Sequence, residues 1–409
     1  MTPALALGIG ELNRRQLADV PEQAWRAEIR DFIADLPADF ECVHEDVGYG
    51  FGAWSPDLLR RIGEKQWIGL CWPVDAGGTH RPVQELYVLL QELAYARVPA
   101  EALLYSLAVS SSLLRFGSPE LQRELLPVIS RGDATFCEGL TEPDAGSDLL
   151  ALRTRARLEG EKWVIDGQKI WTSNGWAADY ALIIARTEPN ALKHQGLSAF
   201  IIDLRLPGVS TRPILDMAGQ PSFSEIFFDG VQIPSHYLVG QRGDGFNVVL
   251  ELLEWDRLWA RSVKAPFLQR MWEDLVTYSR QTTRCGASLW DIDGLRDQLV
   301  DLGVEIEVCD SLFEHALRRM VHEGASAIEE VSMAKVFADR LGERFFHVAQ
   351  ELRGAAGQLS SADVESDLES VHHRIVRGAL TAHGVMIAGG TPEVQRAAVA
   401  TRYFGLARS

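Results

Sequence analysis

Two short segments of the sequence combine hydroxyl groups, turn residues and a large aromatic ring. Residues 141–148 read TEPDAGSD, a turn-rich loop after a predicted strand, whose hydroxyl and backbone N–H groups could bind an anion or the polar edge of a ring. Residues 169–175 read KIWTSNG, and the indole of Trp171 beside hydroxyl groups is a suitable wall for a planar aromatic cofactor. Each segment also has a structural interpretation, as a turn and as a core tryptophan. The residue types alone leave both open.

A third group of chemically useful residues lies on the helix predicted after the loop VGQRGDG. Its apolar spacing predicts a buried stripe at Phe246, Val249, Leu250 and Leu253. At about 100° per residue, Arg257 falls within that stripe, and Glu254 and Asp256 fall on its two flanks. Half-buried carboxylates with raised pKa values can act as general bases. The alternative is that both form ion pairs with Arg257 or Arg261 and only hold helices together.

The elements that must position these residues change type twice along the chain. Residues 1–131 have helical spacing, with Ser118 predicted to cap a helix that begins at Pro119. Residues 132–243 contain short β-rich runs separated by turns, including TFCEGLTE, RTRARL, KWVIDGQKIWTSN, DYALIIART, LSAFIIDL and SEIFFDGVQIP. Residues 244–409 return to helical spacing. The sequence therefore predicts an α+β multidomain chain ordered as helices, strands and helices.

Composition limits the classes of partner. The 409 residues include 40 basic and 57 acidic side chains, a net charge of −17, which disfavours binding to nucleic acid or anionic lipid. The five cysteines are scattered, which is typical of a reducing compartment, and His372 and His373 lack metal-ligand spacing, so no metal site is predicted. No leader and no membrane span are predicted. We expect a cytoplasmic enzyme.

Six segments in order along nearly the whole chain resemble the acyl-CoA dehydrogenase family. They are TEPDAGSD, WVIDGQKIWTSNGWAADY, SEIFFDGVQIP, LVGQRGDGF, VSMAKVFADR and GGTPEVQRAAVATRYFG. The resemblance implies an N-terminal helical domain, a middle β domain and a C-terminal four-helix bundle. It also implies a dimer or tetramer that binds FAD at its subunit boundaries.

The resemblance implies cofactor contacts at matching positions. Those at the flavin ring and the thioester are Leu140, Thr141, Ser147, Trp171 and Ser173, and those at the adenine half are Thr391 and Glu393. Ser147 is also a substrate position. At the pyrophosphate, an arginine from a neighbouring subunit is expected where Thr282 stands, so Arg280 or Arg284 would have to substitute. The segment QELRG, with Gln350 and Gly354, matches a further cofactor loop.

The family reaction is α,β-dehydrogenation of an acyl thioester, in which a carboxylate removes the α-proton as hydride leaves for the flavin. The usual glutamate position before the last helix is Gly389 here, which keeps only the backbone N–H that helps polarise the thioester carbonyl. Some members carry the base on the first helix of the C-terminal domain, before an arginine. The match here is Asp256 before Arg257, and Arg257 is expected at the catalytic site and at the substrate. Glu254 nearby is a second candidate for the base and a further substrate contact. Aspartate is one methylene shorter, and a displacement of ~1 Å can cost ~10²-fold.

Two other functions stay open. Gly389 and Thr282 favour a catalytically incomplete subunit that pairs with a complete chain, and a flavin monooxygenase or oxidase on the same fold would need no base. The expected partners are an acyl thioester, on coenzyme A or a carrier protein, and an electron-transfer flavoprotein or similar acceptor.

Overall fold

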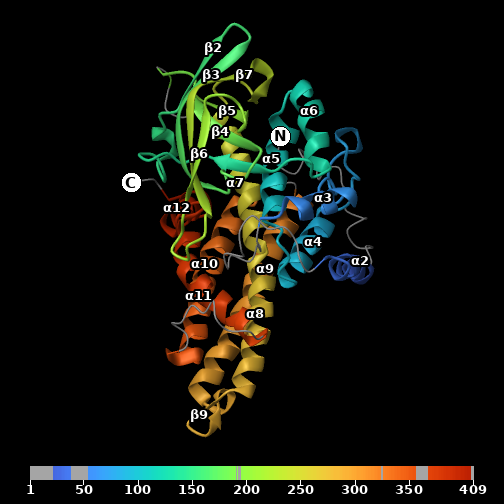
Figure 1. Cartoon of the computed structure of the whole chain (residues 1–409), viewed down its shortest axis with the longest axis vertical. Coiled ribbons are helices and arrows are strands. Elements are labelled where there is room, and N and C mark those ends of the chain that lie inside the picture. The colour runs from blue at the N-terminus through green and yellow to red at the C-terminus, as the bar shows by residue number, and fades with distance from the viewer. Residues whose placement is uncertain are drawn as a thin grey trace.

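The structure is a computed structural model that describes residues 22–37, 54–189, 191, 195–323, 326–355 and 367–406. Helices of the first part of the chain lie beside a twisted sheet, and long helices extend away from that sheet (Figure 1). The first helices are α2 (Glu22–Ala34), α3 (Pro56–Glu64), α4 (Val83–Tyr95), α5 (Glu101–Phe116) and α6 (Pro119–Ser130). Ser118 caps α6 as predicted, because its hydroxyl accepts the N–H of Leu121.

In the part of the chain that the structure describes, the main sheet has eight strands. They are β1 (Phe136–Gly139), β2 (Arg155–Glu159), β3 (Lys162–Ser173), β4 (Tyr180–Arg186), β5 (Leu197–Asp203), β6 (Val209–Ile214), β7 (Phe223–Pro234) and β8 (Leu238–Val239). Their order is β6-β7-β3-β2-β4-β5-β8, and β1 pairs with β4 in parallel. The six predicted runs all contain strands. The pattern missed β6 and β8, because β6 is a largely polar, exposed run and β8 has only two residues.

The remaining helices form the C-terminal bundle. They are α7 (Gly245–Ser262), α8 (Lys264–Gln281), α9 (Asp293–Glu323), α10 (Ile328–Arg353), α11 (Asp367–Ile387) and α12 (Pro392–Arg402), with a small hairpin of β9 (Thr283–Arg284) and β10 (Ala287–Ser288). The predicted α+β order of helices, sheet and helices is confirmed. The domain boundaries at 1–131, 132–243 and 244–409 stay predictions.

Two hydrophobic cores hold the described parts together. The larger core joins the N-terminal helices, the bundle and one side of the sheet, including Phe136 of β1. The smaller core lies among the strands themselves and includes Cys137. Neighbouring residues of β1 therefore face different cores, as the alternation of a strand requires. This alternation decides which side chains of β1 face the helices.

Helix α7 is buried on a different face from the predicted one. Val248, Val249, Leu252 and Trp255 are buried, whereas Phe246, Leu250 and Leu253 are only partly buried. The prediction failed because α7 packs against α5, α10 and β5, so apolar residues surround most of the helix and their spacing does not select one face. Arg257 and Glu254 are buried, and Asp256 is half-buried.

Candidate active site

A buried ion pair joins the loop 141–148 to strand β3. The Lys169 ammonium lies 2.8 Å from the Glu142 carboxylate and also donates to the Leu140 carbonyl. Glu142 accepts the backbone N–H groups of Arg153 and Thr154 as well. Lys169 is fully buried, and burial lowers its pKa to about 8. The two motifs found in the sequence are thus tied together by residues that the sequence reasoning did not single out.

Trp171 is presented to the outside of β3 by a strained backbone. The pairing of β3 with β7 shifts register between Lys169 and Thr172, and Trp171 adopts φ +58° in that bulge. Its indole is 56% exposed and packs edge-on against Phe223. A non-glycine residue at positive φ costs about 1–3 kcal/mol and is typical of functional sites. The core interpretation of this tryptophan is therefore wrong.

The hydroxyl residues predicted at the flavin lie on the loop and the strand next to Trp171. Thr141 and Leu140 are partly buried, and the Thr141 carbonyl accepts the N–H of Ile170, next to Trp171. Ser173 ends β3 and forms a hydrogen bond with Tyr105 of α5. Ser147 lies further along the loop and is exposed. An exposed flat ring on a strand whose neighbouring residues carry hydroxyl groups suits the isoalloxazine of a flavin.

Asp256 and Gly389 come together from opposite ends of the bundle sequence. A Cβ atom placed on Gly389 would lie 3.6 Å from Asp256 Oδ2. Gly389 has φ +67°, and Gly390 has φ +96°, so both occupy conformations that favour glycine. The carboxylate of Asp256 therefore lies where a side chain at position 389 would begin.

Three side chains hold the loop around Gly389 in place. Arg257 Nε donates to the Gly389 carbonyl at 2.9 Å, and Arg261 Nη2 donates to the Ala388 carbonyl at 3.1 Å. Gln395 of α12 donates to the carbonyls of Gly389 and Gly390. With its carbonyl oxygens fixed, this loop has a defined peptide orientation, as a carbonyl-polarising N–H requires.

Opposing effects set the ionisation of Asp256. Burial raises its pKa, and the charges of Arg261, Arg257 and Lys335 act in the opposite direction. Lys335 of α10 is itself fully buried and lies 2.5 Å from Asp339, and burial lowers its pKa to about 8. A carboxylate in this setting can be both ionised and basic, which is what a general base needs.

Glu254 points elsewhere. Its carboxylate accepts the Ser326 hydroxyl at 2.7 Å and the N–H of Ala327 at 3.0 Å, where α10 begins. A carboxylate at the start of a helix satisfies free N–H groups and the helix dipole. This geometry favours a structural role for Glu254 over the predicted base or substrate contact, but through hydrogen bonds to the start of α10 and not through the expected ion pair with Arg257 or Arg261.

The predicted adenine and pyrophosphate positions lie apart. Thr391 caps α12 by accepting the N–H of Val394, and Glu393 is exposed beside Arg396. The remaining predicted positions are Arg280, Arg284, Gln350 and Gly354. They lie near the β9 hairpin, at the far end of the bundle from the sheet (Figure 1).

Arg284 is the arginine best placed at this far end. Its Nη2 donates to the Leu352 carbonyl at 2.7 Å, beside Gly354, which has φ +60°. Arg280 instead stacks on Trp290, with its guanidinium carbon 4.8 Å from the ring centre. Gln350 is half-buried near the end of α10. Of these two arginines, Arg284 is therefore the one next to the QELRG segment.

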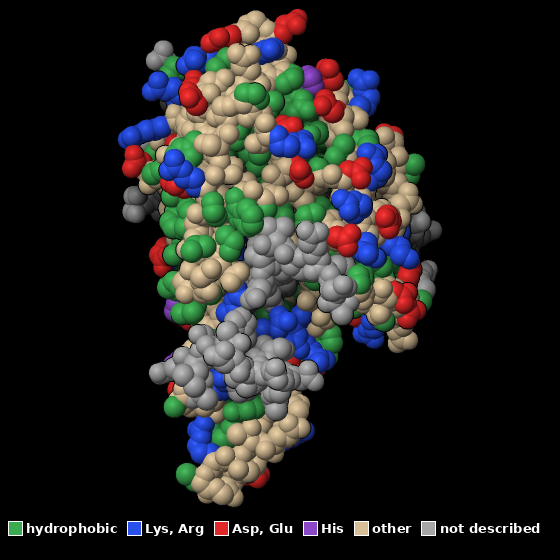
Figure 2. Space-filling model, viewed as in Figure 1, with side chains coloured by type: hydrophobic (Ala, Val, Ile, Leu, Met, Phe, Trp, Pro, Cys, Tyr) green, Lys and Arg blue, Asp and Glu red, His purple; other side chains and the backbone are tan. Residues whose placement is uncertain are grey.

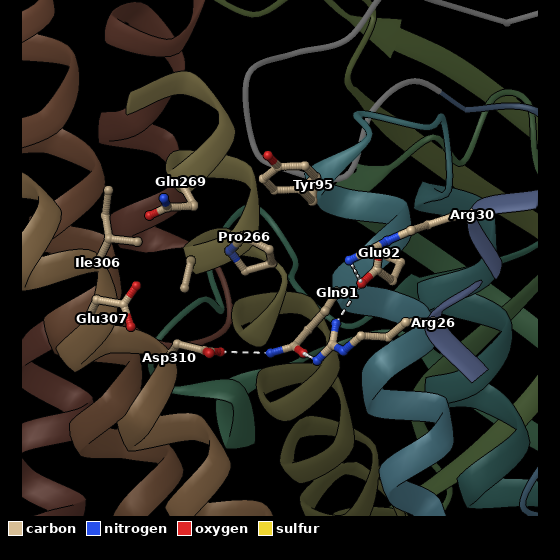
Figure 3. A pocket seen from close by; sticks show the side chains of 11 residues that line it. Arg26, Arg30, Gln91, Glu92, Tyr95, Pro266, Gln269, Ile306, Glu307 and Asp310 are labelled. Carbon is tan, nitrogen blue, oxygen red and sulfur yellow. Dashed lines mark hydrogen bonds and ion pairs between the residues drawn. The ribbon is translucent and has the colours of Figure 1, made fainter. Parts of the chain in front are cut away.

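A separate pocket of about 230 Å³ contains no predicted site residue (Figure 3). Arg26 and Arg30 of α2 both bind Glu92 of α4, at 2.6 and 2.8 Å, and Gln91 donates to Asp310 of α9. Because these groups bind one another across three helices, the arrangement is explained by packing. No group of three or more His, Cys, Asp or Glu residues in the described ranges could hold a metal, and the side chains of His372 and His373 lie outside them.

Helices pack on one side of a sheet that presents the exposed indole of Trp171, and the half-buried carboxylate of Asp256 lies on α7 beside Gly389. These features fit a flavin-dependent oxidoreductase. Models of the N-terminal, middle and C-terminal domains of acyl-CoA dehydrogenase match residues 21–133, 137–231 and 243–404. Acyl-CoA dehydrogenase FadE26 of Mycobacterium tuberculosis is 30% identical over 95% of this chain and 98% of its own length. Acyl-CoA dehydrogenase IpdE1 of Mycolicibacterium smegmatis is 31% identical over 94% of this chain and 98% of its own length.

The chain belongs to the acyl-CoA dehydrogenase family. It is similar to the solved structure of the Tcur3481-Tcur3483 steroid ACAD, with TM-score 0.83, 28% identity and coverage of 95% of this chain and 98% of that one. It is also similar to the ChsE4-ChsE5 complex from Mycobacterium tuberculosis, with TM-score 0.81, 27% identity and coverage of 96% of this chain and 99% of that one. The protein is a flavoprotein oxidoreductase that uses FAD. No helix in the described part of the chain is long and apolar enough to cross a membrane.

Proposed function

We propose that this protein dehydrogenates an acyl thioester, carried by coenzyme A or a carrier protein, at the bond between the α- and β-carbons, and that Asp256 is the base. The observation that carries this proposal is the 3.6 Å between Asp256 Oδ2 and the Cβ position of Gly389. The base is absent from the usual loop, but a carboxylate reaches the same place from α7. FAD, when bound, supplies the acceptor for the hydride that leaves the β-carbon.

The residues of this chain divide the rest of the chemistry among them. Asp256 Oδ2 takes the α-proton, and the N–H of Gly389 polarises the thioester carbonyl while the negative charge develops. Arg257 and Arg261 hold the carbonyls of this loop and balance the charge of Asp256. Trp171, Ser173, Leu140 and Thr141 form the wall for the flavin.

Anaerobic flavin bleaching tests the base. Purified protein should be yellow, and a panel of acyl thioesters should bleach it. Asp256→Asn should slow bleaching by roughly 10²–10⁴-fold, the usual contribution of a general base. Undiminished bleaching in that variant would refute the proposal. Glu254→Gln is the matched control on the same helix and should keep the bleaching rate.

A second variant separates loss of the base from loss of folding. Adding Gly389→Glu to Asp256→Asn should restore at least part of the bleaching, since the Cβ position has room, at 3.4 Å or more from its neighbours. The positive φ would cost about 1–2 kcal/mol in a residue other than glycine. Failure to restore bleaching in a well-folded, yellow double variant would argue that position 389 does not face the substrate.

The positions of the cofactor residues support a homo-oligomer, a dimer or tetramer. Arg284 belongs to the β9 hairpin, which lies far from the sheet that carries Trp171 (Figure 1), so a single FAD would contact both only if two chains contribute. An apolar groove of about 430 Å³ beside α12, lined by Met333, Phe337, Val399 and the 65% exposed Phe404, is suited to such a contact. Electron-transfer flavoprotein, or a similar protein, is the proposed acceptor.

The hetero-oligomer is the second candidate, because two similar solved structures are named as pairs of chains. The visible spectrum of the chain purified alone distinguishes the two. Flavin bound without a partner chain, and bleached by thioesters, would favour the homo-oligomer. A colourless chain that binds flavin only with a second gene product would favour the hetero-oligomer.

A further inference from the structure

A second carboxylate, Glu138, lies close to the proposed base. Glu138 is on β1, two residues from Phe136, so its side chain leaves the strand on the side that faces the helices. Its charge and that of Asp256 act on each other, although the two residues belong to β1 and α7. Two carboxyl groups that share a poorly solvated site cannot both ionise easily.

One oxygen of the Glu138 carboxyl group, Oε1, is buried without a hydrogen-bond partner within the described ranges. An ionised carboxylate would pay a large desolvation cost there, whereas a protonated carboxyl group would not. Burial and the charge of Asp256 together raise the pKa of Glu138 well above its ordinary value.

The cations are distributed unequally between the two carboxyl groups. Asp256 is affected by Arg257 and Arg261 of its own helix and by Lys335 of α10. Glu138 is affected by burial and by the charge of Asp256, and Tyr105 of α5 is affected by both carboxylates. Lys169 of β3, whose stem lies beside Gly139, is already bound to Glu142. One negative charge in this site is therefore more stable on Asp256 than on Glu138.

We propose that Glu138 is a positioning residue for the base: its carboxyl group holds the one proton that the Glu138–Asp256 pair retains, which keeps Asp256 ionised and the site singly charged. The inference rests on the proposed role of Asp256. Removal of the α-proton brings the pair to two protons, and one of them passes to solvent when product leaves. Tyr105, which bonds Ser173 at the flavin edge and is affected by both carboxylates, links the pair to the cofactor wall.

This arrangement predicts a bell-shaped dependence of flavin reduction on pH. Protonation of Asp256 stops the reaction on the acid side, and ionisation of Glu138 places a second negative charge beside the developing enolate on the alkaline side. At pH values above the ionisation of Glu138, the rate of flavin reduction in the wild type should fall by roughly tenfold per pH unit. In Glu138→Gln, a neutral mimic of the same shape, the alkaline fall should disappear and the acid limb should stay.

The experiment uses the FAD-loaded enzyme and single-turnover reduction by an acyl-CoA that bleaches the wild type. Glu138→Asp should keep an alkaline limb, and Glu101→Gln, a change to the neighbouring buried carboxylate on α5, should keep both limbs. Infrared spectra at neutral pH should show a protonated carboxyl band in wild type and in Asp256→Asn that is lost in Glu138→Gln. A Glu138→Gln profile that keeps its alkaline limb, or the absence of that band, would overturn the role of Glu138. Unchanged bleaching in Asp256→Asn would refute the base itself, and with it the pairing.

Discussion

At the scale of single residues, the Lys169–Glu142 pair fixes the cofactor loop to β3. Both side chains are buried, and removal of one partner of a buried ion pair typically costs about 3–5 kcal/mol. Lys169→Met should therefore lower the free energy of unfolding by about 3 kcal/mol and reduce the flavin content. Urea unfolding and the flavin-to-protein absorbance ratio measure the two effects. Glu142→Gln with Lys169→Met should recover most of the loss, because no buried charge is left unpaired.

The same pair predicts an acid dependence of stability. Burial alone would raise the pKa of Glu142, but Lys169 and the hydrogen bonds from Thr154 and Arg153 outweigh it and lower the pKa. A carboxylate whose pKa is lowered by folding stabilises the folded state at pH values above its pKa in the unfolded chain. This stabilisation is lost as the pH falls through the pKa of the carboxylate in the folded chain. Wild type should lose stability below about pH 4.5 more steeply than the double variant. Equal slopes in urea titrations at several pH values would contradict this.

At the scale of elements, α12 positions the catalytic loop. Gln395 is buried and donates to two carbonyls of the loop that contains Gly389. Gln395→Met removes both donors at similar volume, so we expect a loss of about 1–3 kcal/mol and slower flavin bleaching at unchanged flavin content. Thr401→Val, on the same helix, removes only hydrogen bonds internal to that helix and should leave bleaching unchanged. Equal bleaching in the two variants would mean that α12 does not orient the loop.

At the scale of the whole molecule, the sheet and the β9 hairpin lie far apart (Figure 1), and hydrophobic side chains gather on the left of the view below the sheet (Figure 2). If two copies share each FAD, two defective chains should complement each other. Asp256→Asn and Arg284→Gln homo-oligomers should each be inactive. Random mixed dimers should recover about one quarter of wild-type sites, measured as bleaching after refolding or co-expression. No recovery in a mixture shown to contain mixed dimers would refute the shared site.

Some of the fold and the site could be predicted from the sequence, and each success has a local cause. The Ser118 cap, the strands and the order of helices and sheet depend on neighbouring residues and on short periodicities. The face of α7 was predicted wrongly, because three sets of neighbours bury it at once. Trp171 was ambiguous for a similar reason: only the bulge in β3 shows that its ring points outward.

The sequence by itself determined the acyl-CoA dehydrogenase type, since its cofactor motifs are short, ordered and locally defined. Only the tertiary structure placed Asp256 beside Gly389, and Glu138 beside Asp256. Arg257 bonds Gly389 across 132 residues, and no local periodicity reports such a contact. Hydrophobic spacing limits which face of a helix is buried, but the charges that meet in a site depend on how several elements pack. The position and the charged neighbours of the proposed base are therefore set by tertiary packing.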